Sequence, residues 1–283
     1  MLFIFVLLLF ALTLDCQRIT EVENDVIRKK CGVRSLKRKA HFKIFGGRGV
    51  SSDEYPWLVQ IVVSRHLGGK LNIKSCTGSL ISPRHVLTAA HCVTNKNPKE
   101  NLHKCDGKEH VLDVSIVKSQ DLIVYTGTFC RLQLYCGNLQ RVRKVIVHKN
   151  WKRCVQSSVI PIAELSANDL AILELEKNIR YENAVPICLP SENLRLQRAL
   201  QGAGSGHDSK SRVPTLNVAT LRFLAHEPRT SIILTSSKDT SACGVNEWIS
   251  IRFDIADVSP LVEKNPPTRS TLWASRWWHS STS

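Results

Sequence analysis

The sequence predicts an all-β protein. The chain has 283 residues and is 43% hydrophobic, which gives it enough apolar material for a folded core. Short runs rich in β-branched and apolar residues are typical of strands, and they occur at residues 58–63, 122–125, 142–148 and 213–224. Residues 21–43 show neither helical nor strand periodicity, so we expect an accessible linker there.

The chain opens on a nearly unbroken apolar run over residues 2–10, shorter than the roughly 20 residues that span a bilayer. This pattern predicts a signal peptide over residues 1–16 and a secreted, extracellular protein without a transmembrane segment. Ten cysteines agree with an oxidising compartment and a disulfide framework. If Cys16 leaves with the leader, nine remain (ten minus one), and one of them lacks an intramolecular partner.

The formal net charge of +15 is compatible with an acidic polysaccharide, a membrane surface or nucleic acid as partner. The Lys and Arg residues are scattered, however, and no aromatic interleaving or nucleic-acid motif accompanies them, so we expect no nucleic-acid partner. His103, Cys105 and His110 resemble metal ligands in type only. No Cys-x-x-Cys spacing supports a zinc site, and we expect neither metal nor cofactor.

The strongest functional signal is the sequence Thr-Ala-Ala-His-Cys at residues 88–92. Residues 79–88 before it predict two short strands around a turn at Pro83. Cys76 lies just upstream, so Cys76 and Cys92 could join these strands. A histidine delivered beside an anchored cysteine suits a site in which the imidazole faces outward, and we interpret His91 as catalytic.

Residues 76–81 (Cys-Thr-Gly-Ser-Leu-Ile) followed by residues 87–92 (Leu-Thr-Ala-Ala-His-Cys) resemble the trypsin- and chymotrypsin-like serine endopeptidases. The resemblance runs from about Cys31 to Leu224. It implies two antiparallel six-stranded Greek-key barrels with the site between them, the first complete and the second incomplete. It also implies peptide-bond hydrolysis by a monomer, with protein or peptide substrates and protease inhibitors as partners.

In this family a zymogen is cut before an Ile-Val-Gly-Gly-like sequence, which Ile-Phe-Gly-Gly at residues 44–47 resembles. The resemblance therefore implies a propeptide or linker over residues 17–43, cleavage between Lys43 and Ile44, and a protease domain over residues 44–283. It further implies a bridge from Cys31 to Cys188 that tethers the propeptide, and a second bridge from Cys76 to Cys92. Four other cysteines allow three pairings, which stay open: Cys105, Cys130, Cys136 and Cys154.

Asp169 opens a mostly apolar strand, where a carboxylate needs a partner to offset its desolvation. Taken alone, it would more often be a strand cap or a salt-bridge partner. The resemblance instead makes Asp169 the residue that orients His91 and stabilises the imidazolium. The two residues are 78 positions apart (169 minus 91), so surface loops must absorb the chain between them.

The family's nucleophile motif, Gly-Asp-Ser-Gly-Gly, is absent from the sequence. Residues 239–244 resemble the residues that precede this motif in the family. Deletion of residues 245–256 would nearly restore the order of residues that the family has there. We therefore interpret this segment as an insertion, by an unremoved intron or by divergence, and the domain as aberrant after about residue 225. Ser259 is the nearest candidate nucleophile, although Pro260 behind it has no N–H to donate.

Two alternatives stay open at this point. If Ser241 lies on the floor of a specificity pocket, the pocket would not favour substrates with Lys or Arg. A shifted alignment that places Asp239 there would favour them. The loss of the nucleophile motif also allows a catalytically inactive homologue that acts as a binding protein.

Overall fold

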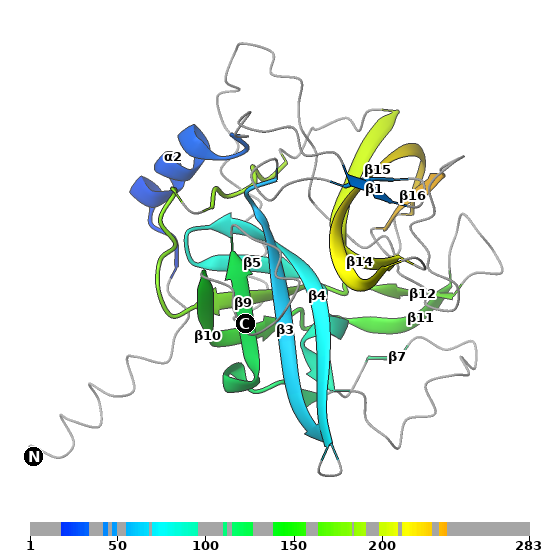
Figure 1. The fold of residues 1–283 in the computed structure, drawn as a ribbon, viewed down its shortest axis with the longest axis horizontal. Coiled ribbons are helices and arrows are strands. Elements are labelled where there is room, and N and C mark those ends of the chain that lie inside the picture. Colours follow the sequence, from blue (N-terminus) through cyan, green and yellow to red (C-terminus); the bar gives the residue numbers. More distant parts are fainter. Residues whose placement is uncertain are drawn as a thin grey trace, which may run out of the picture.

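The computed structural model describes residues 18–33, 42–44, 47–49, 55–67, 70–95, 110–111, 115–126, 138–156, 164–182, 184–190, 198–208, 211–227 and 232–236. Strands dominate these residues, as the sequence predicts (Figure 1). In chain order the elements are α2 (Glu21–Lys30), β1 (Phe42–Ile44), β2 (Gly47–Gly49), β3 (Leu58–Leu67), β4 (Lys70–Ser82), β5 (His85–Thr88), η2 (Ala90–Cys92), β6 (Thr94–Asn95), β7 (His110–Val111), β8 (Ser115–Ile116), η3 (Ser119–Asp121), β9 (Leu122–Thr126), β10 (Leu139–Val147), β11 (Lys152–Gln156), β12 (Glu164–Ala167), β13 (Ala171–Leu175), β14 (Ala199–Asp208), β15 (Ser211–Glu227) and β16 (Ile232–Ser236).

Six strands form a closed barrel in the order β10-β13-β5-β4-β3-β9. All neighbouring strands are antiparallel, and the ring closes where β9 pairs with β10. Large apolar side chains fill the interior of the barrel, because removing their surface from water stabilises the fold. Those with at most 2% of their surface exposed include Trp57, Leu58, Ile61, Leu80, Leu122 and Leu173. The first barrel of the predicted fold is therefore confirmed.

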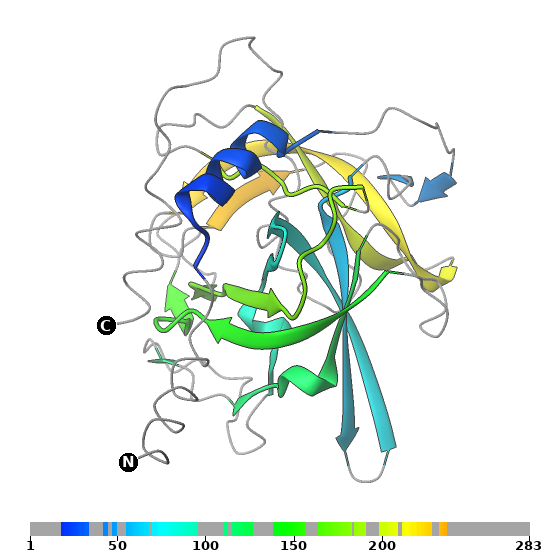
Figure 2. The ribbon, with the colours of Figure 1, turned by 90° about the vertical axis from the view of Figure 1, so that its left-hand side faces the viewer.

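A second sheet follows the path β1-β2-β15-β14, with β16 paired to β15. Figure 2 shows its two long, curved strands, β14 and β15 (yellow), beside the barrel. Ala203 of β14 and Val218 of β15 belong to the same buried apolar cluster as the barrel core. In the part of the chain that the structure describes, this sheet has five strands and does not close. It is thus less complete than the first barrel, as expected.

The predicted turn at Pro83 joins β4 to β5. The Ser82 hydroxyl accepts hydrogen bonds from the backbone N–H groups of Arg84 (3.2 Å) and His85 (3.0 Å). Serine commonly closes turns in this way because its hydroxyl replaces a backbone acceptor. The turn therefore sets the register in which β5 returns along β4.

Gly78 of β4 lies where a side chain would not fit. A Cβ atom there would lie 2.7 Å from Cγ1 of Val86 and 2.9 Å from Cδ1 of Ile61. Both neighbours are fully buried, so neither can move without disturbing the core. The glycine therefore allows β5 and β3 to pack closely against β4.

The segment expected to be an accessible linker, residues 21–43, contains a helix that its sequence pattern does not predict, because residues 21–30 form α2. The helix begins at a capping box. The Thr20 hydroxyl accepts the Glu23 N–H (3.2 Å), and the Glu23 carboxylate accepts the Thr20 N–H (2.8 Å). Ile27 is the buried residue of α2, whereas Val22 and Val26 are exposed, so apolar burial contributes little to the docking of this helix.

Helix α2 (blue in Figure 2) is joined to the barrel by an ion pair between Glu23 and Arg84. Two nitrogens of the Arg84 guanidinium bind its carboxylate, at 2.6 and 3.1 Å. These Arg84 bonds, together with that from the Thr20 N–H, lower the pKa of Glu23 to about 2. The predicted disulfide between Cys31 and Cys188 is confirmed and lies just beyond the helix. The N-terminal segment is therefore held by an ion pair at one end and by a covalent bond at the other.

We expect Gly78→Ala to lower the free energy of unfolding by about 1–3 kcal/mol, because the added methyl group overpacks the core. Chemical denaturation measures the difference. Gly202→Ala is the matched control, because the atom nearest to its Cβ, Cδ1 of Leu221, lies 3.2 Å away, compared with 2.7 Å at Gly78. A Gly78→Ala variant no less stable than the control would contradict this packing argument.

We expect Glu23→Gln to lower the free energy of unfolding at pH 7 by roughly 1 kcal/mol, a value reduced for solvent screening. Because the folded-state pKa of Glu23 lies below its ordinary value of 4.5, the wild-type advantage is complete above that pH. It shrinks as the pH falls and vanishes near pH 2. Denaturation across this range measures it. Asp25→Asn, at an exposed ion pair with Arg28, is the control. An advantage of equal size at pH 7 and pH 3 would refute the assignment.

Candidate active site

The pairing of β5 with β13 brings His91 and Asp169 together. The two strands are antiparallel, and Thr88 at the end of β5 faces Ala171 at the start of β13. Residues that follow β5 therefore leave the barrel at the same end as residues that precede β13. His91 lies three residues after Thr88 (91 minus 88), and Asp169 two before Ala171 (171 minus 169).

Both oxygens of the Asp169 carboxylate bind His91. Oδ1 accepts the backbone N–H of His91 at 2.8 Å, and Oδ2 lies 3.0 Å from the ring nitrogen Nδ1. The Asp169 side chain is 3% exposed, so these bonds offset the cost of burying its charge. The two residues predicted to meet, from positions far apart in the sequence, do so in the structure.

This contact also sets the tautomer of the neutral imidazole. An ionised carboxylate only accepts hydrogen bonds, so Nδ1 of His91 carries the proton. In the neutral ring, Nε2 is then left with a lone pair that can accept a proton. The His91 side chain is 45% exposed while its aspartate partner is buried. The arrangement presents a base to the surface and keeps its orienting group away from water.

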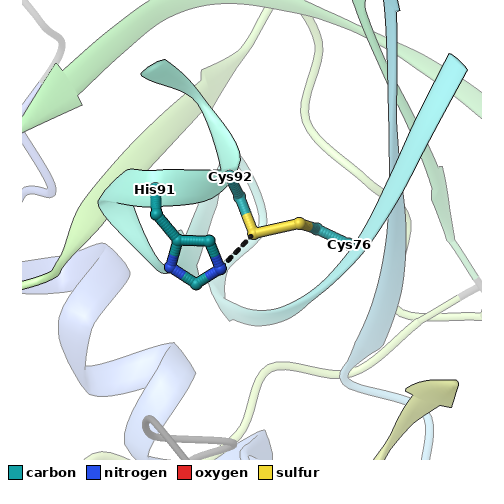
Figure 3. A group of neighbouring side chains, drawn as sticks. All are labelled: Cys76, His91 and Cys92. Atoms are coloured by element: carbon teal, nitrogen blue, oxygen red, sulfur yellow. Dashed lines mark hydrogen bonds between the residues drawn. A yellow bond between two sulfur atoms is a disulfide. The ribbon is translucent and has the colours of Figure 1, made fainter. Parts of the chain in front are cut away.

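A disulfide anchors the residue that follows His91. The predicted bond between Cys76 and Cys92 is confirmed and ties β4 to the short helix η2 (Figure 3). Nε2 of His91 lies 3.7 Å from the Cys92 sulfur. The Lys74 ammonium, also from β4, donates to the His91 carbonyl at 3.2 Å. The backbone of His91 is therefore held by β4 at two points.

Cys76, His91 and Cys92 form a cluster of the kind that can bind a metal, since their ligand atoms lie within 4.8 Å of one another. Metal binding by cysteine requires the thiolate, and both sulfurs are joined in the disulfide. The imidazole is thus the one ligand that this cluster offers in its oxidised form.

Sequence comparison places this arrangement in a known family. The family model described as "Trypsin" matches residues 44–246, or 203 of the 283 residues (246 minus 44, plus one). The chain belongs to the trypsin family. This family is one of serine endopeptidases, as the sequence motifs around His91 predict.

Two curated relatives of this chain illustrate the similarity. "CLIP domain-containing serine protease HP8" of Bombyx mori is 31% identical over 168 residues, which cover 58% of this chain and 38% of the relative. "Serine protease ea" of Drosophila melanogaster is 30% identical over 162 residues, which cover 54% of this chain and 36% of the relative. The chain therefore spans less than two fifths of the length of these relatives.

The third predicted site residue of the trypsin-like protein, Ser259, lies outside the described residues. So do Asp239, Ser241 and the other residues around the expected nucleophile motif. The four cysteines with open pairing are likewise unassigned, because the described part of the chain gives a side-chain environment to none of them. Among the described residues, no helix has the length and apolar character of a membrane span.

Two residues next to this site were not singled out from the sequence. Lys74 gives no local signal, because its role depends on the pairing that brings β4 beside His91. Asn168 does carry a local signal, because asparagine tolerates the left-handed backbone better than most residues. In the structure the φ of Asn168 is 55°. An asparagine directly before an aspartate that opens a strand could have indicated a turn.

Proposed function

We propose that the protein is a secreted serine endopeptidase that hydrolyses peptide bonds in proteins. The observation that carries the proposal is the bond between buried Asp169 and Nδ1 of half-exposed His91. Membership of the trypsin family gives this pair its chemical meaning. In the proposed reaction His91 is the general base and then the general acid, Asp169 orients it, and Ser259 is the nucleophile.

The proposed reaction proceeds by acyl transfer. Nε2 of His91 takes the hydroxyl proton of Ser259 as the serine oxygen attacks the carbonyl carbon of the substrate. The imidazolium, stabilised by Asp169, then gives this proton to the leaving amine as the peptide bond breaks. Water attacks the resulting ester with the same proton transfers, which release the acid and restore the serine. The net reaction consumes one water for each bond cleaved.

We infer that the protein is made as a zymogen and activated by cleavage between Lys43 and Ile44. The backbone of both residues lies in β1, at the edge of the second sheet, where it pairs with β2. Edge strands are the part of a sheet that another chain can approach. Cleavage would free the Ile44 amino group, while the bond between Cys31 and Cys188 would keep residues 17–43 attached.

Two disulfides within the described residues support the proposed secretion, because such bonds persist in oxidising compartments. The relatives are named serine proteases, which supports protein substrates, and by extension protease inhibitors, as partners. We propose that the enzyme acts as a monomer.

A second function is favoured by one specific observation. The sequence lacks Gly-Asp-Ser-Gly-Gly, and Pro260 follows the candidate nucleophile. Proline has a fixed φ, so Pro260 lacks the backbone freedom of the glycine that follows the serine in the family motif. The alternative is a catalytically inactive homologue that binds a protein partner.

Labelling with a fluorophosphonate, which reacts with activated serines, distinguishes the two functions. The protein is made with the recognition sequence of a site-specific protease before Ile44, so that cleavage gives the new N-terminus. We expect one label per cleaved molecule and none at Ser259→Ala. His91→Ala should slow labelling by roughly 100-fold or more, because the base is lost.

The control for this experiment is His226→Ala, which removes an exposed histidine of β15 and should label like the wild type. N-terminal sequencing confirms that cleavage occurred before Ile44. Absence of labelling in cleaved protein that remains folded by circular dichroism would exclude the enzyme and support the binding protein.

A further inference from the structure

Asn168, directly before Asp169, has an unusual backbone. Its φ is 55°, and within the described ranges it is the non-glycine residue with a positive φ. This left-handed region disfavours most side chains, and asparagine is one of the few that occupy it regularly. The Leu170 N–H donates to the Asn168 carbonyl at 2.8 Å, which closes a tight turn of three residues. Asp169 lies at the apex of that turn.

A neighbouring turn holds this backbone on both sides of Asp169. The Asn168 side-chain amide donates to the Asn150 carbonyl at 2.9 Å. The His148 N–H donates to the Leu170 carbonyl, also at 2.9 Å. One bond lies before Asp169 in the chain and the other after it. Together they fix the position of its Cα atom relative to the end of β10.

The turn at residues 148–151 is itself anchored. The Trp151 N–H donates to the His148 carbonyl at 3.1 Å, and the Trp151 residue is 6% exposed. The Asn150 N–H donates to Nδ1 of His148 at 3.2 Å. Burial and then the charge of Lys149 lower the pKa of His148, which favours the neutral ring that can accept this bond.

Asp169 needs such support because its carboxylate makes two bonds to one residue. The side chain is short, so the backbone position decides whether Oδ1 reaches the His91 N–H and Oδ2 reaches Nδ1. We propose that Asn168 is a positioning residue: its left-handed backbone directs the Asp169 carboxylate to His91, and its side-chain bond to Asn150 is a secondary support. This inference rests on the proposed roles of His91 and Asp169.

Three substitutions separate the backbone contribution from that of the side chain. Asn168→Gly keeps access to the left-handed region but removes the amide. Asn168→Asp also tolerates this region and removes the donor. Asn168→Ala disfavours the region and removes the amide. Because the turn conformation dominates in our account, we expect the glycine and aspartate variants to keep the contact with His91 and the alanine variant to lose it.

The readout is the low-field NMR resonance of the His91 Nδ1 proton, assigned by its loss in His91→Ala. This resonance reports the bond to Asp169 and needs no nucleophile. We expect it in the wild type and in Asn168→Gly, and expect it weakened or absent in Asn168→Ala. In the cleaved enzyme, Asn168→Ala should lower kcat by roughly tenfold to hundredfold with KM changed less than about twofold.

Glu23→Gln is the stability control, since it destabilises the fold at α2 and should leave the resonance unchanged. A wild-type resonance in Asn168→Ala would overturn the proposal, and so would its loss in folded Asn168→Gly. If Asn168→Ala does not fold, the glycine and aspartate variants still decide. Failure of fluorophosphonate labelling with the resonance intact would contradict the proposed enzyme but not the positioning role.

Discussion

The antiparallel pairing of β5 with β13 is the constraint on which the site depends. Because Thr88 faces Ala171 in this ladder, residues that are 78 positions apart leave the barrel side by side. The closed ring of six strands holds the ladder in place, and local devices then refine each partner. The bond between Cys76 and Cys92 anchors the His91 side, and the turn at Asn168 shapes the Asp169 side. The fold supplies proximity, and these devices supply orientation.

The short strand β5 also connects the site to the N-terminal segment. Arg84 precedes β5 and binds Glu23 of helix α2, while His91 follows β5 at its other end. The barrel ladder lies between these two contacts. The ion pair that holds helix α2 and the imidazole of His91 therefore lie at opposite ends of β5. The ion pair and the bond from Cys31 to Cys188 give the N-terminal segment two independent supports.

The strongly patterned parts of this protein could be predicted from its sequence, and the weakly patterned parts could not. Runs rich in β-branched and apolar residues predicted strands, three of which belong to the barrel. The motifs around His91 and Asp169 predicted that these two side chains meet, as they do. Helix α2 was missed because it contributes little to the apolar core: Ile27 is its buried residue. Its stability comes from tertiary contacts, although Thr20 and Glu23 did carry a readable capping box. Lys74 and Asn150 act through strand pairing and turn packing, which no local pattern encodes.

The most direct measurement of the central claim is a double-mutant cycle between His91 and Asp169, read as the free energy of unfolding at pH 7. His91→Ala keeps the backbone N–H that Asp169 binds, so the cycle with Asp169→Ala isolates the bond between ring and carboxylate. If the ladder joins them as described, the two substitutions couple by about 1–3 kcal/mol. Effects that add within about 0.5 kcal/mol would mean that the two side chains do not interact, and the account of the site would be wrong.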